Sequence, residues 1–560
     1  MAVKQFYFLG EDVSSSVAVE IDAQSDFDAL RRTVAGHLCV VEPTGIDFSI
    51  DSSPLTEVSD ILSADGPIAV TIDGKMVREV PGPKGYPYVG SYYEIFPDHL
   101  GNHQRLFETY GPVIKTTNMG STIYQTNDPA IASIVFSESD FFTKKINESH
   151  PLWGIKDQQA GVFLGDTEDE NWKVTHKFLP PAFGPKAVRH YAPEMQKSVE
   201  SAFKVFDEFD ERGEVWNVYQ YMLKLGSQAV GKLVLGMDFD HFSSKDAPIA
   251  QFVRLVVHAL ELNKKVTSRG SWYASLPFGD PKALRATRQQ MHDLIDDAIS
   301  KVVGAGAEDL ELQEAALKAS CIADYCMRAV DSQGEKLPKK NLHSALVVAT
   351  GAGFTTTSSL LSWLIYGLVT YPGMQERLLQ ELVDAGIDED TQYDADTISR
   401  LPFLENYVKE MQRRHNPSFQ PGRTAKIDLV LPGGYKIPEG AVVIPALHHI
   451  HNNPALWDNP AKFNPDRWNT PEVKNRHKTA YVPFATGPRG CIGFNFALME
   501  AKIFLPKLVY RYKFSKASDD AVQYDPMFQL IRPVNLYVRA ERRVKWPPRS
   551  EDMADADADA

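Results

Sequence analysis

Short apolar runs and one amphipathic pattern fill the first part of the chain. Residues 4–9 are strand-like, and apolar side chains alternate with polar or small ones at residues 17–21, so we expect two strands joined by a turn. An amphipathic helix is predicted to open at Ser25, because apolar residues recur on one of its faces. Two further strand-like runs follow, at residues 47–50 and 68–72.

This order of strand, strand, helix, strand, strand resembles that of a ubiquitin-like β-grasp fold. The resemblance implies that residues 1–76 form a small α+β ubiquitin-like (β-grasp) module with a possible role in binding a protein partner. The alternative is an irregular N-terminal extension that packs on the main body.

A stretch rich in Pro and Gly, residues 77–90, follows this part of the chain. Its run Pro-Gly-Pro-Lys-Gly-Tyr-Pro at residues 81–87 predicts a stiff connector, because each Pro fixes φ and removes a hydrogen-bond donor. Residues 91–545 have a mostly helical pattern, with a strand-rich patch at residues 426–444. Residues 546–560 end in an acidic, low-complexity run and are expected to be disordered.

One long segment lacks charge. No Asp, Glu, Lys or Arg occurs from Asn341 to Gln375, but Thr, Ser and Gly crowd its middle, residues 350–359. The segment is therefore expected to be a long buried helix of a large helical protein and not a membrane span. The first thirty residues contain no apolar run longer than residues 6–9, so no N-terminal transmembrane anchor is expected.

Composition narrows the class of protein. With 43% hydrophobic and 24% charged residues, extensive disorder is excluded. The 73 acidic residues outnumber the 59 Lys and Arg, which argues against nucleic acid as a partner. Four cysteines in 560 residues are too few for a disulfide scaffold. We therefore expect a cytoplasmic protein, with peripheral docking to the endoplasmic reticulum as the alternative.

The strongest chemical signal is a cysteine in a glycine-rich loop, residues 484–493, followed by a helical pattern. Glycines at 487, 490 and 493 let the backbone turn tightly and approach a flat cofactor. A helix that begins just after Cys491 offers N–H groups and a positive dipole end, which favour a thiolate. The residues alone leave open whether this thiolate is a nucleophile or an iron ligand.

This loop resembles the haem-binding loop of the cytochromes P450, Phe-x-x-Gly-x-Arg-x-Cys-x-Gly, at every fixed position. Over about residues 80 to 545, the resemblance implies a mainly α fold with small β-sheets and a haem b cofactor (iron protoporphyrin IX). Cys491 would be the axial ligand of the iron, Arg489 would pair with a haem propionate, and Phe484 would pack near the sulfur. Gly487 is the first fixed glycine of the loop.

Two more segments resemble the family's structural pair. Glu410 and Arg413 fit its Glu-x-x-Arg motif, and at a spacing of three residues they share one helical face. Arg467, in the run Phe-Asn-Pro-Asp-Arg-Trp, matches the arginine that joins the pair. The resemblance implies a structural cluster and not a catalytic one.

Other residues match positions that face the haem propionates. Trp172 and His176 resemble the family's Trp and basic residue on one helix, with His in place of Arg, as in bacterial fatty-acid hydroxylases fused to their reductase. Arg423 matches a strand arginine that reaches a propionate. The histidines within residues 448–451 are interpreted as part of a family segment and not as a metal site, because cysteine or carboxylate partners at ligand spacing are missing.

The uncharged helix contains Ala-Gly-Phe-Thr-Thr-Thr at residues 352–357. It resembles the family's oxygen-activation motif, except that Thr355 stands where an acid is usual. Thr356 is expected to hydrogen-bond dioxygen or its water. The missing acid puts the proton relay in doubt, although a water chain from Thr355 and Thr356 could replace it.

The resemblance implies a haem-thiolate monooxygenase. It would insert one oxygen atom from O2 into an apolar or amphipathic organic substrate, a lipid or secondary metabolite, with electrons from a separate NADPH-dependent reductase or ferredoxin. Thr355 motivates one alternative, a haem-thiolate isomerase, dehydratase or nitric oxide reductase; a non-catalytic haem-binding interaction protein is another. Substrate-pocket walls are expected from Phe141, Phe142, Trp153, Phe163, Val348, Ala352 and residues 418–422.

Overall fold

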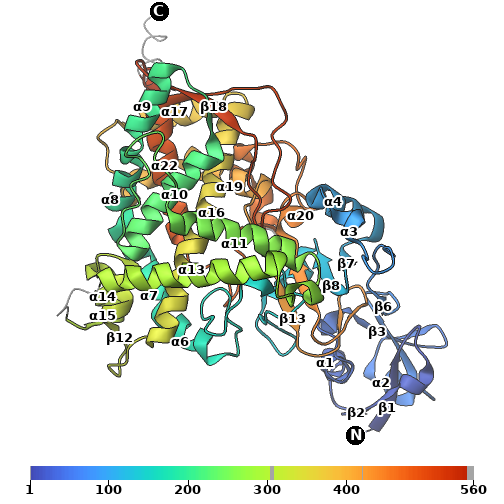
Figure 1. The fold of residues 1–560 in the computed structure, drawn as a ribbon. Coiled ribbons are helices and arrows are strands. Elements are labelled where there is room, and N and C mark those ends of the chain that lie inside the picture. The colour runs from blue at the N-terminus through green and yellow to red at the C-terminus, as the bar shows by residue number, and fades with distance from the viewer. Residues whose placement is uncertain (1, 303–307, 419–420, 552–560) are drawn as a thin grey trace, which may run out of the picture. The chain divides into compact units, whose positions relative to one another are not determined.

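The computed structural model describes residues 2–302, 308–418 and 421–551. Helices dominate these ranges and the strands form small sheets (Figure 1), which is the mainly helical fold that the sequence predicts. The chain packs into two compact units. The first unit comprises residues 1–150, 420–446 and 486–489, and the second comprises residues 151–419, 447–485 and 490–560.

The first unit begins with a five-stranded sheet against which helix α1 (Phe27–Leu38) packs. The strand order is β2-β1-β5-β3-β4, with β1 and β5 parallel and the other neighbours antiparallel. Asp26, and not Ser25, caps the helix, because its side chain accepts a hydrogen bond from the Ala29 N–H at 2.6 Å. The strands are β1 (Ala2–Phe8), β2 (Val17–Ile21), β3 (Ile46–Ile50), β4 (Ser53–Leu55) and β5 (Ile68–Ile72).

Val430, in a strand far along the chain, shares a core with this sheet. Val430 lies in the same buried cluster as Phe6. The Val41 N–H donates to the Val430 carbonyl at 3.1 Å, and the Val430 N–H donates to the Cys39 carbonyl at 3.0 Å. A three-stranded sheet continues from this contact, formed by β14 (Leu429–Leu431), β15 (Tyr435–Ile437) and β6 (Arg78–Glu79).

A second five-stranded sheet of the first unit holds Arg423. Its order is β7-β8-β16-β13-β9, and Arg423 pairs with Val443 in the antiparallel register of β13 and β16. The sheet therefore fixes the backbone of Arg423 from a neighbouring strand. The strands are β7 (Val113–Asn118), β8 (Ser121–Thr126), β9 (Phe142–Thr143), β13 (Arg423–Ala425) and β16 (Val442–Pro445), and helices α4 (His99–Tyr110) and α5 (Pro129–Phe136) belong to the same unit.

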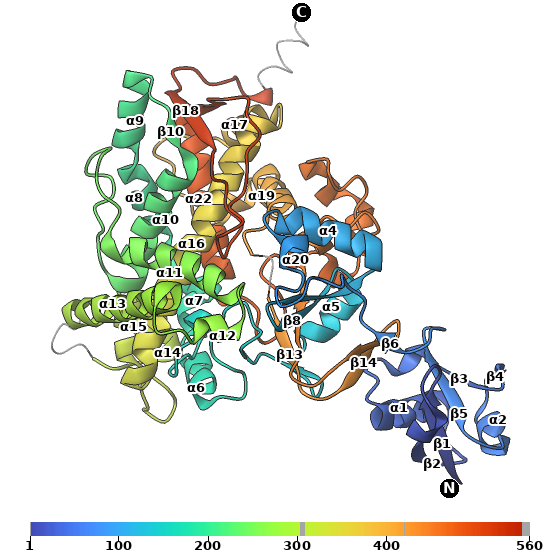
Figure 2. The same ribbon diagram turned by 45° about the vertical axis from the view of Figure 1, so that its right-hand side comes forward.

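The second unit is built around α16 (Lys339–Thr370), which contains most of the uncharged segment. Within the described ranges it is the one helix long and apolar enough to cross a membrane, and 61% of its apolar window is buried inside the protein. It is therefore packed as a core helix. The helices that pack on it include α10 (Val218–Leu235), α13 (Gly279–Val302), α19 (Pro402–Arg414) and α22 (Phe494–Arg511) (Figure 2).

The described part of the C-terminal segment contacts this second unit. The Trp546 indole N–H donates to the Tyr510 carbonyl at 3.0 Å, and the Ser550 hydroxyl donates to Asp384 at 2.7 Å. Residues 552–560, in the predicted acidic tail, lie outside the described residues. The unit's other main elements are α6 (Glu170–Phe178), α8 (Pro185–Ser201), α9 (Phe203–Arg212), α11 (Gln251–Thr267), α17 (Met374–Asp384), β10 (Trp216–Asn217), β17 (Tyr512–Lys516) and β18 (Tyr537–Arg542).

Candidate functional site

The loop that carries Cys491 is closed by its own backbone. The Cys491 N–H donates to the Phe484 carbonyl at 2.9 Å. Helix α22 begins three residues later, at Phe494, and runs for 18 residues. Cys491 itself is exposed. The N-terminal end of a long helix offers N–H groups and a positive dipole end, a setting that suits a metal-binding thiolate.

Gly487 is required by the shape of this loop. Its φ is +77°, a left-handed conformation that side chains with a Cβ rarely adopt, and a Cβ there would stand 2.7 Å from the Phe136 carbonyl oxygen. A Cβ on Gly493 would lie 4.0 Å from the Cys491 sulfur. The Phe484 ring lies 6.2 Å from the Phe494 ring, so these two aromatic side chains flank the loop close to its closure.

Arg423 is a buried cation whose hydrogen bonding is incomplete. Its side chain is 1% exposed; its Nη1 donates to the Gly422 carbonyl at 2.9 Å, and its Nε lies 3.5 Å from Glu138 Oε1. Its Nη2 has no hydrogen-bond partner among the described residues. Burial lowers the pKa of Arg423 to about 10, and Glu138 opposes that shift. A buried guanidinium with an unsatisfied N–H is ready to receive an anion. Arg489, in the same unit, is also buried.

The middle of α16 has a less buried face. Ala352 is exposed, and Gly353 and Thr356 are half-buried, in a helix whose other residues there are buried. The Thr356 hydroxyl donates to the Ala352 carbonyl at 2.8 Å. Thr355 is 1% exposed and donates to the Gly351 carbonyl at 2.8 Å. The two threonines therefore differ: Thr356 belongs to the open face, and Thr355 is packed in the core.

Trp172 and His176 lie one turn apart on α6. Their rings stack at 4.6 Å between centroids with an angle of 17° between planes. Trp172 is half-buried and His176 is exposed. The helix therefore presents the two rings together, as the spacing of four residues predicts.

Glu410, Arg413 and Arg467 are brought together in the second unit. Glu410 and Arg413 are 0% exposed, and the Glu410 carboxylate accepts hydrogen bonds from the Arg413 Nε and Nη2 at 2.9 and 3.0 Å and from the Arg467 Nε at 3.0 Å. Sequence reasoning missed two further donors, the Trp468 indole N–H at 3.2 Å and the Asn464 backbone N–H at 2.9 Å. The carboxylate is thus fully engaged inside the protein.

This cluster connects to the cysteine loop through His451. The Arg413 Nη1 donates to the His451 carbonyl at 2.9 Å, and the Val482 N–H donates to His451 Nε2 at 3.0 Å. Burial lowers the pKa of His451 to about 3, so its ring is neutral and can accept. Within residues 2–302, 308–418 and 421–551, no group of three His, Cys, Asp or Glu side chains could hold a metal ion.

The residues expected to form the walls of a substrate pocket differ in how far they are buried. Phe142 is 0% exposed and belongs to the core of the first unit, so it is a packing residue. Phe163 is 44% exposed, and Trp153 and Val348 are half-buried. Within residues 418–422, positions 419 and 420 lie outside the described residues.

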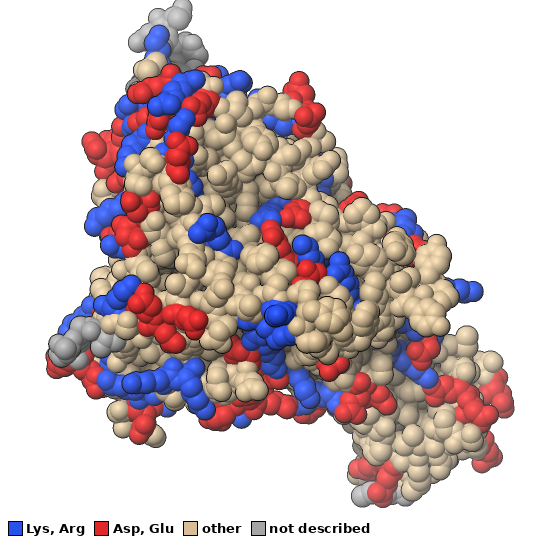
Figure 3. Space-filling model, viewed as in Figure 1, with Lys and Arg blue, Asp and Glu red and all other residues tan. Residues whose placement is uncertain are grey.

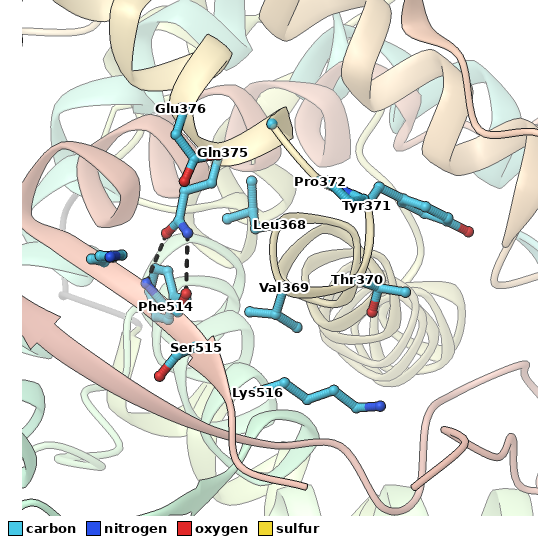
Figure 4. Close-up of a pocket in the computed structure, with 12 residues that line it drawn as sticks. Leu368, Val369, Thr370, Tyr371, Pro372, Gln375, Glu376, Phe514, Ser515 and Lys516 are labelled. Carbon is cyan, nitrogen blue, oxygen red and sulfur yellow. Dashed lines mark hydrogen bonds between the residues drawn. The ribbon is translucent and has the colours of Figure 1, made fainter. Parts of the chain in front are cut away.

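A recess of about 500 Å³ lies at the C-terminal end of α16, lined by residues 368–373, 375, 376 and 513–516 (Figure 4). There the Gln375 side chain pairs with the Phe514 backbone: its Nε2 donates to the carbonyl at 3.1 Å, and the N–H donates to its Oε1 at 2.7 Å. None of the predicted site residues lines this recess. Of the residues expected to bind haem, to activate oxygen or to form the structural cluster, Arg423, Gly487 and Arg489 belong to the first unit and the others to the second.

Comparisons with known proteins agree on one family. The family model described as Cytochrome P450 matches residues 80–538. The chain is 49% identical over 554 residues to "Cytochrome P450 monooxygenase alnD" of Emericella nidulans, covering 98% of this chain and 100% of that protein. It is 28% identical over 369 residues to "Cytochrome P450 4F3" of Homo sapiens, covering 63% and 69%. The solved "cytochrome P450DA heme domain" superposes with a TM-score of 0.74 at 23% identity, covering 84% and 99%.

Proposed function

The chain belongs to the cytochrome P450 family, whose members are haem-thiolate monooxygenases with haem b, and we propose that Cys491 is the residue that binds the haem iron. The observation that carries this proposal is an exposed thiol close to the start of α22, in a loop with every fixed residue of the family's haem-binding motif. When bound, the haem supplies the iron at which O2 is activated with two electrons.

The remaining cofactor residues are proposed from their chemistry. The buried Arg423, whose Nε and Nη2 have no hydrogen-bond partner among the described residues, fits an anionic propionate, and Arg489 is a second buried cation of the same unit. Trp172 and His176 offer ring N–H groups for the same purpose. Phe484 and Gly487 shape the loop.

Thr356 is the proposed hydroxyl of the oxygen site. Because it already donates to the Ala352 carbonyl, its oxygen lone pairs remain to accept a hydrogen bond from water or substrate on the open face of α16. Thr355 is buried with its hydroxyl bonded back to the helix backbone, and it is proposed to be a packing residue without a direct part in proton transfer.

Glu410, Arg413 and Arg467 are proposed to position the cysteine loop. Arg413 holds the His451 carbonyl, and the His451 ring holds Val482, two residues before Phe484. A rigid path of hydrogen bonds therefore links the buried cluster to the backbone that closes around Cys491.

The proposed substrate class is based on the apolar side chains on the less buried face of α16. Val348 and Ala352, one turn apart, are apolar and not fully buried, and no charged residue occurs on α16 beyond Lys339 and Lys340. We propose an apolar or amphipathic substrate, a lipid or secondary metabolite, and electrons from a separate NADPH-dependent reductase or ferredoxin. Isomerase, dehydratase, nitric oxide reductase and non-catalytic roles are not favoured, because the relative at 49% identity is a monooxygenase by name.

The N-terminal residues are proposed to form a ubiquitin-like (β-grasp) module over residues 1–76, joined by a connector at 77–90 to the haem domain at 91–545. Two parallel central strands, β1 and β5, and one packed helix support this fold. Thirteen of the first 76 residues are acidic and four are basic, so a partner would present a basic surface. Figure 3 shows acidic side chains of the protein on one face. Because 98% of the chain aligns with the Emericella relative, that protein has counterparts of these residues.

We place the protein in the cytoplasm or at the cytoplasmic face of the endoplasmic reticulum. Cys39, Cys321 and Cys326 are free thiols, as a reducing compartment favours. Cell fractionation with and without high salt would separate a cytoplasmic protein from one held peripherally on membranes.

The reaction is tested with isotopically labelled O2. Purified protein, an NADPH-dependent reductase and a panel of apolar and amphipathic compounds are incubated under ¹⁸O2. The proposal predicts a product that carries one ¹⁸O atom and depends on NADPH. Turnover of an organic hydroperoxide without NADPH, with no labelled product from O2, would support a haem-thiolate isomerase instead.

A further inference from the structure

A buried carboxyl group on α22 has no part in the site described above. Glu500 is 0% exposed and lies on the same face as Phe496 and Phe504, one turn to either side, which are 4% and 0% exposed. Neither of its carboxyl oxygens has a hydrogen-bond partner among the described residues. An ionised carboxylate in this position would cost far more than a neutral acid, because nothing compensates its charge.

Burial without a hydrogen-bond partner therefore favours the neutral, protonated form of Glu500. Burial raises the pKa of the Glu500 carboxyl well above its ordinary value, and the Thr357 hydroxyl opposes the shift only in part. A neutral carboxylic acid donates one O–H, whereas a threonine hydroxyl can only pass on a proton that it receives.

Thr357 places this acid beside the oxygen-activation segment. α16 and α22 pack directly on each other within the second unit. Thr357 is 2% exposed and follows Thr356, the residue of the open face, in the chain. Its hydroxyl is near enough to influence the Glu500 carboxyl. The two groups are not aligned into a hydrogen bond, so a side-chain rotation is needed to join them.

The reaction needs such a donor. Inserting one oxygen atom of O2 and reducing the other to water consumes two electrons, from the reductase, and two protons. Thr355 occupies the place of the usual acid, is buried, and donates its O–H in a hydrogen bond to the Gly351 carbonyl. The protons must therefore pass through another acid or through solvent.

Building on the proposed function, we propose that Glu500 is the relay acid of this enzyme and acts through Thr357. Its O–H proton moves to the Thr357 hydroxyl oxygen as that hydroxyl passes its own proton to water beside Thr356. Glu500 then recovers a proton from solvent. No electrons move in these steps, and each O–H bond that breaks is replaced by one that forms.

The first test needs no turnover. Infrared spectra of the purified holoenzyme should contain the C=O band of a protonated carboxylic acid, shifted in D2O and absent from Glu500→Gln. Glu405→Gln is the control, because Glu405 is paired with Lys409 at 3.1 Å and is only half-buried. A wild-type spectrum without this band, or a band that survives in Glu500→Gln, overturns the proposal.

The second test measures coupling, the fraction of NADPH electrons recovered in product. General acids contribute about 10²–10⁴-fold, and since water can replace part of this, we expect coupling to fall about tenfold or more in Glu500→Gln. The lost electrons should appear as hydrogen peroxide. Product formation driven by added hydrogen peroxide, without NADPH, should change much less. Coupling equal to that of Glu405→Gln refutes the proposal.

Three further changes distinguish a lost proton path from a folding defect. Thr357→Val should lower coupling as Glu500→Gln does while keeping the infrared band, and Thr357→Ser should keep both. Thr355→Asp should restore coupling to Glu500→Gln by returning an acid to α16. If Thr357→Val leaves coupling unchanged, the path is refuted. A protein without a thiolate-haem spectrum would instead refute the proposed function, so the two failures are distinguishable.

Discussion

Replacing Glu410 by Gln removes the one negative charge from a site where two arginines are buried with it. The side chains of Glu410, Arg413 and Arg467 are 0%, 0% and 8% exposed. Gln keeps the length and shape of the side chain but turns one acceptor oxygen into an NH2 group. If the NH2 group replaces Oε2, it would face the Arg413 Nε–H. If it replaces Oε1, it would face the N–H groups of Arg413 Nη2, Arg467 Nε and the Asn464 backbone.

The expected loss is large because the partners cannot reach water. Removing one member of a buried ion pair costs about 3–5 kcal/mol. The matched control is Asp466→Asn, in the same segment as Arg467. Asp466 pairs with Arg377 through two hydrogen bonds of 2.8 and 3.0 Å, but the side chains are 56% and 45% exposed. An exposed pair of this kind contributes about 0–1 kcal/mol.

Urea unfolding separates the two variants. The free energy of unfolding is followed by circular dichroism and by haem absorbance, with the slope against urea concentration as a check on the unfolded state. Glu410→Gln should have a lower midpoint with an unchanged slope and should lose haem at lower urea concentrations. If its midpoint equals that of Asp466→Asn, burial does not determine how much this ion-pair cluster stabilises the protein. The cluster would then not hold the cysteine loop in position.

Three further outcomes follow from single positions. Arg423→Gln should release haem faster to an excess of a haem-scavenging globin, because the buried Nη2 would no longer pair with a propionate, whereas an unchanged rate would contradict that pairing. The pKa of His451 falls from 6.5 to about 3 in the folded protein. The contribution of its neutral ring to the free energy of unfolding is therefore fully present above pH 6.5 and is lost as the pH falls toward 3. His451→Gln should flatten that part of the plot of stability against pH. Gly487→Ala should lose bound haem, as judged by absorbance per protein, whereas Gly440→Ala, with φ +76° and no atom within 4 Å of a Cβ, should keep it; equal haem content would show that the close approach to Phe136 is immaterial.

Local patterns predicted those elements whose burial is periodic. The uncharged run predicted α16 as a buried helix, and alternation predicted β2, because each depends on spacing along the chain alone. The start of α1 was predicted one residue too early, since Ser25 and Asp26 are both good caps and only the backbone conformation decides between them.

For the site, the sequence predicted the residues of known motifs but not the partners that the fold brings to them. Motifs indicated Glu410 and its two arginines, but the Trp468 indole and the Asn464 N–H come from a fold that brings segments about fifty residues apart together. Glu500 gave only a weak signal, an acid at a core spacing between Phe496 and Phe504. Whether such an acid is solvated or buried depends on α16, which lies far away in the sequence.

All the proposed chemistry depends on the binding of haem iron by the Cys491 sulfur. The most direct measurement is a carbon monoxide difference spectrum of the reduced, purified protein and of Cys491→Ser. Ligation by Cys491 predicts the red-shifted Soret band of a thiolate-ligated ferrous haem in the wild-type protein and its loss in the variant. A protein that binds no added haemin, or a band unchanged in Cys491→Ser, would contradict it.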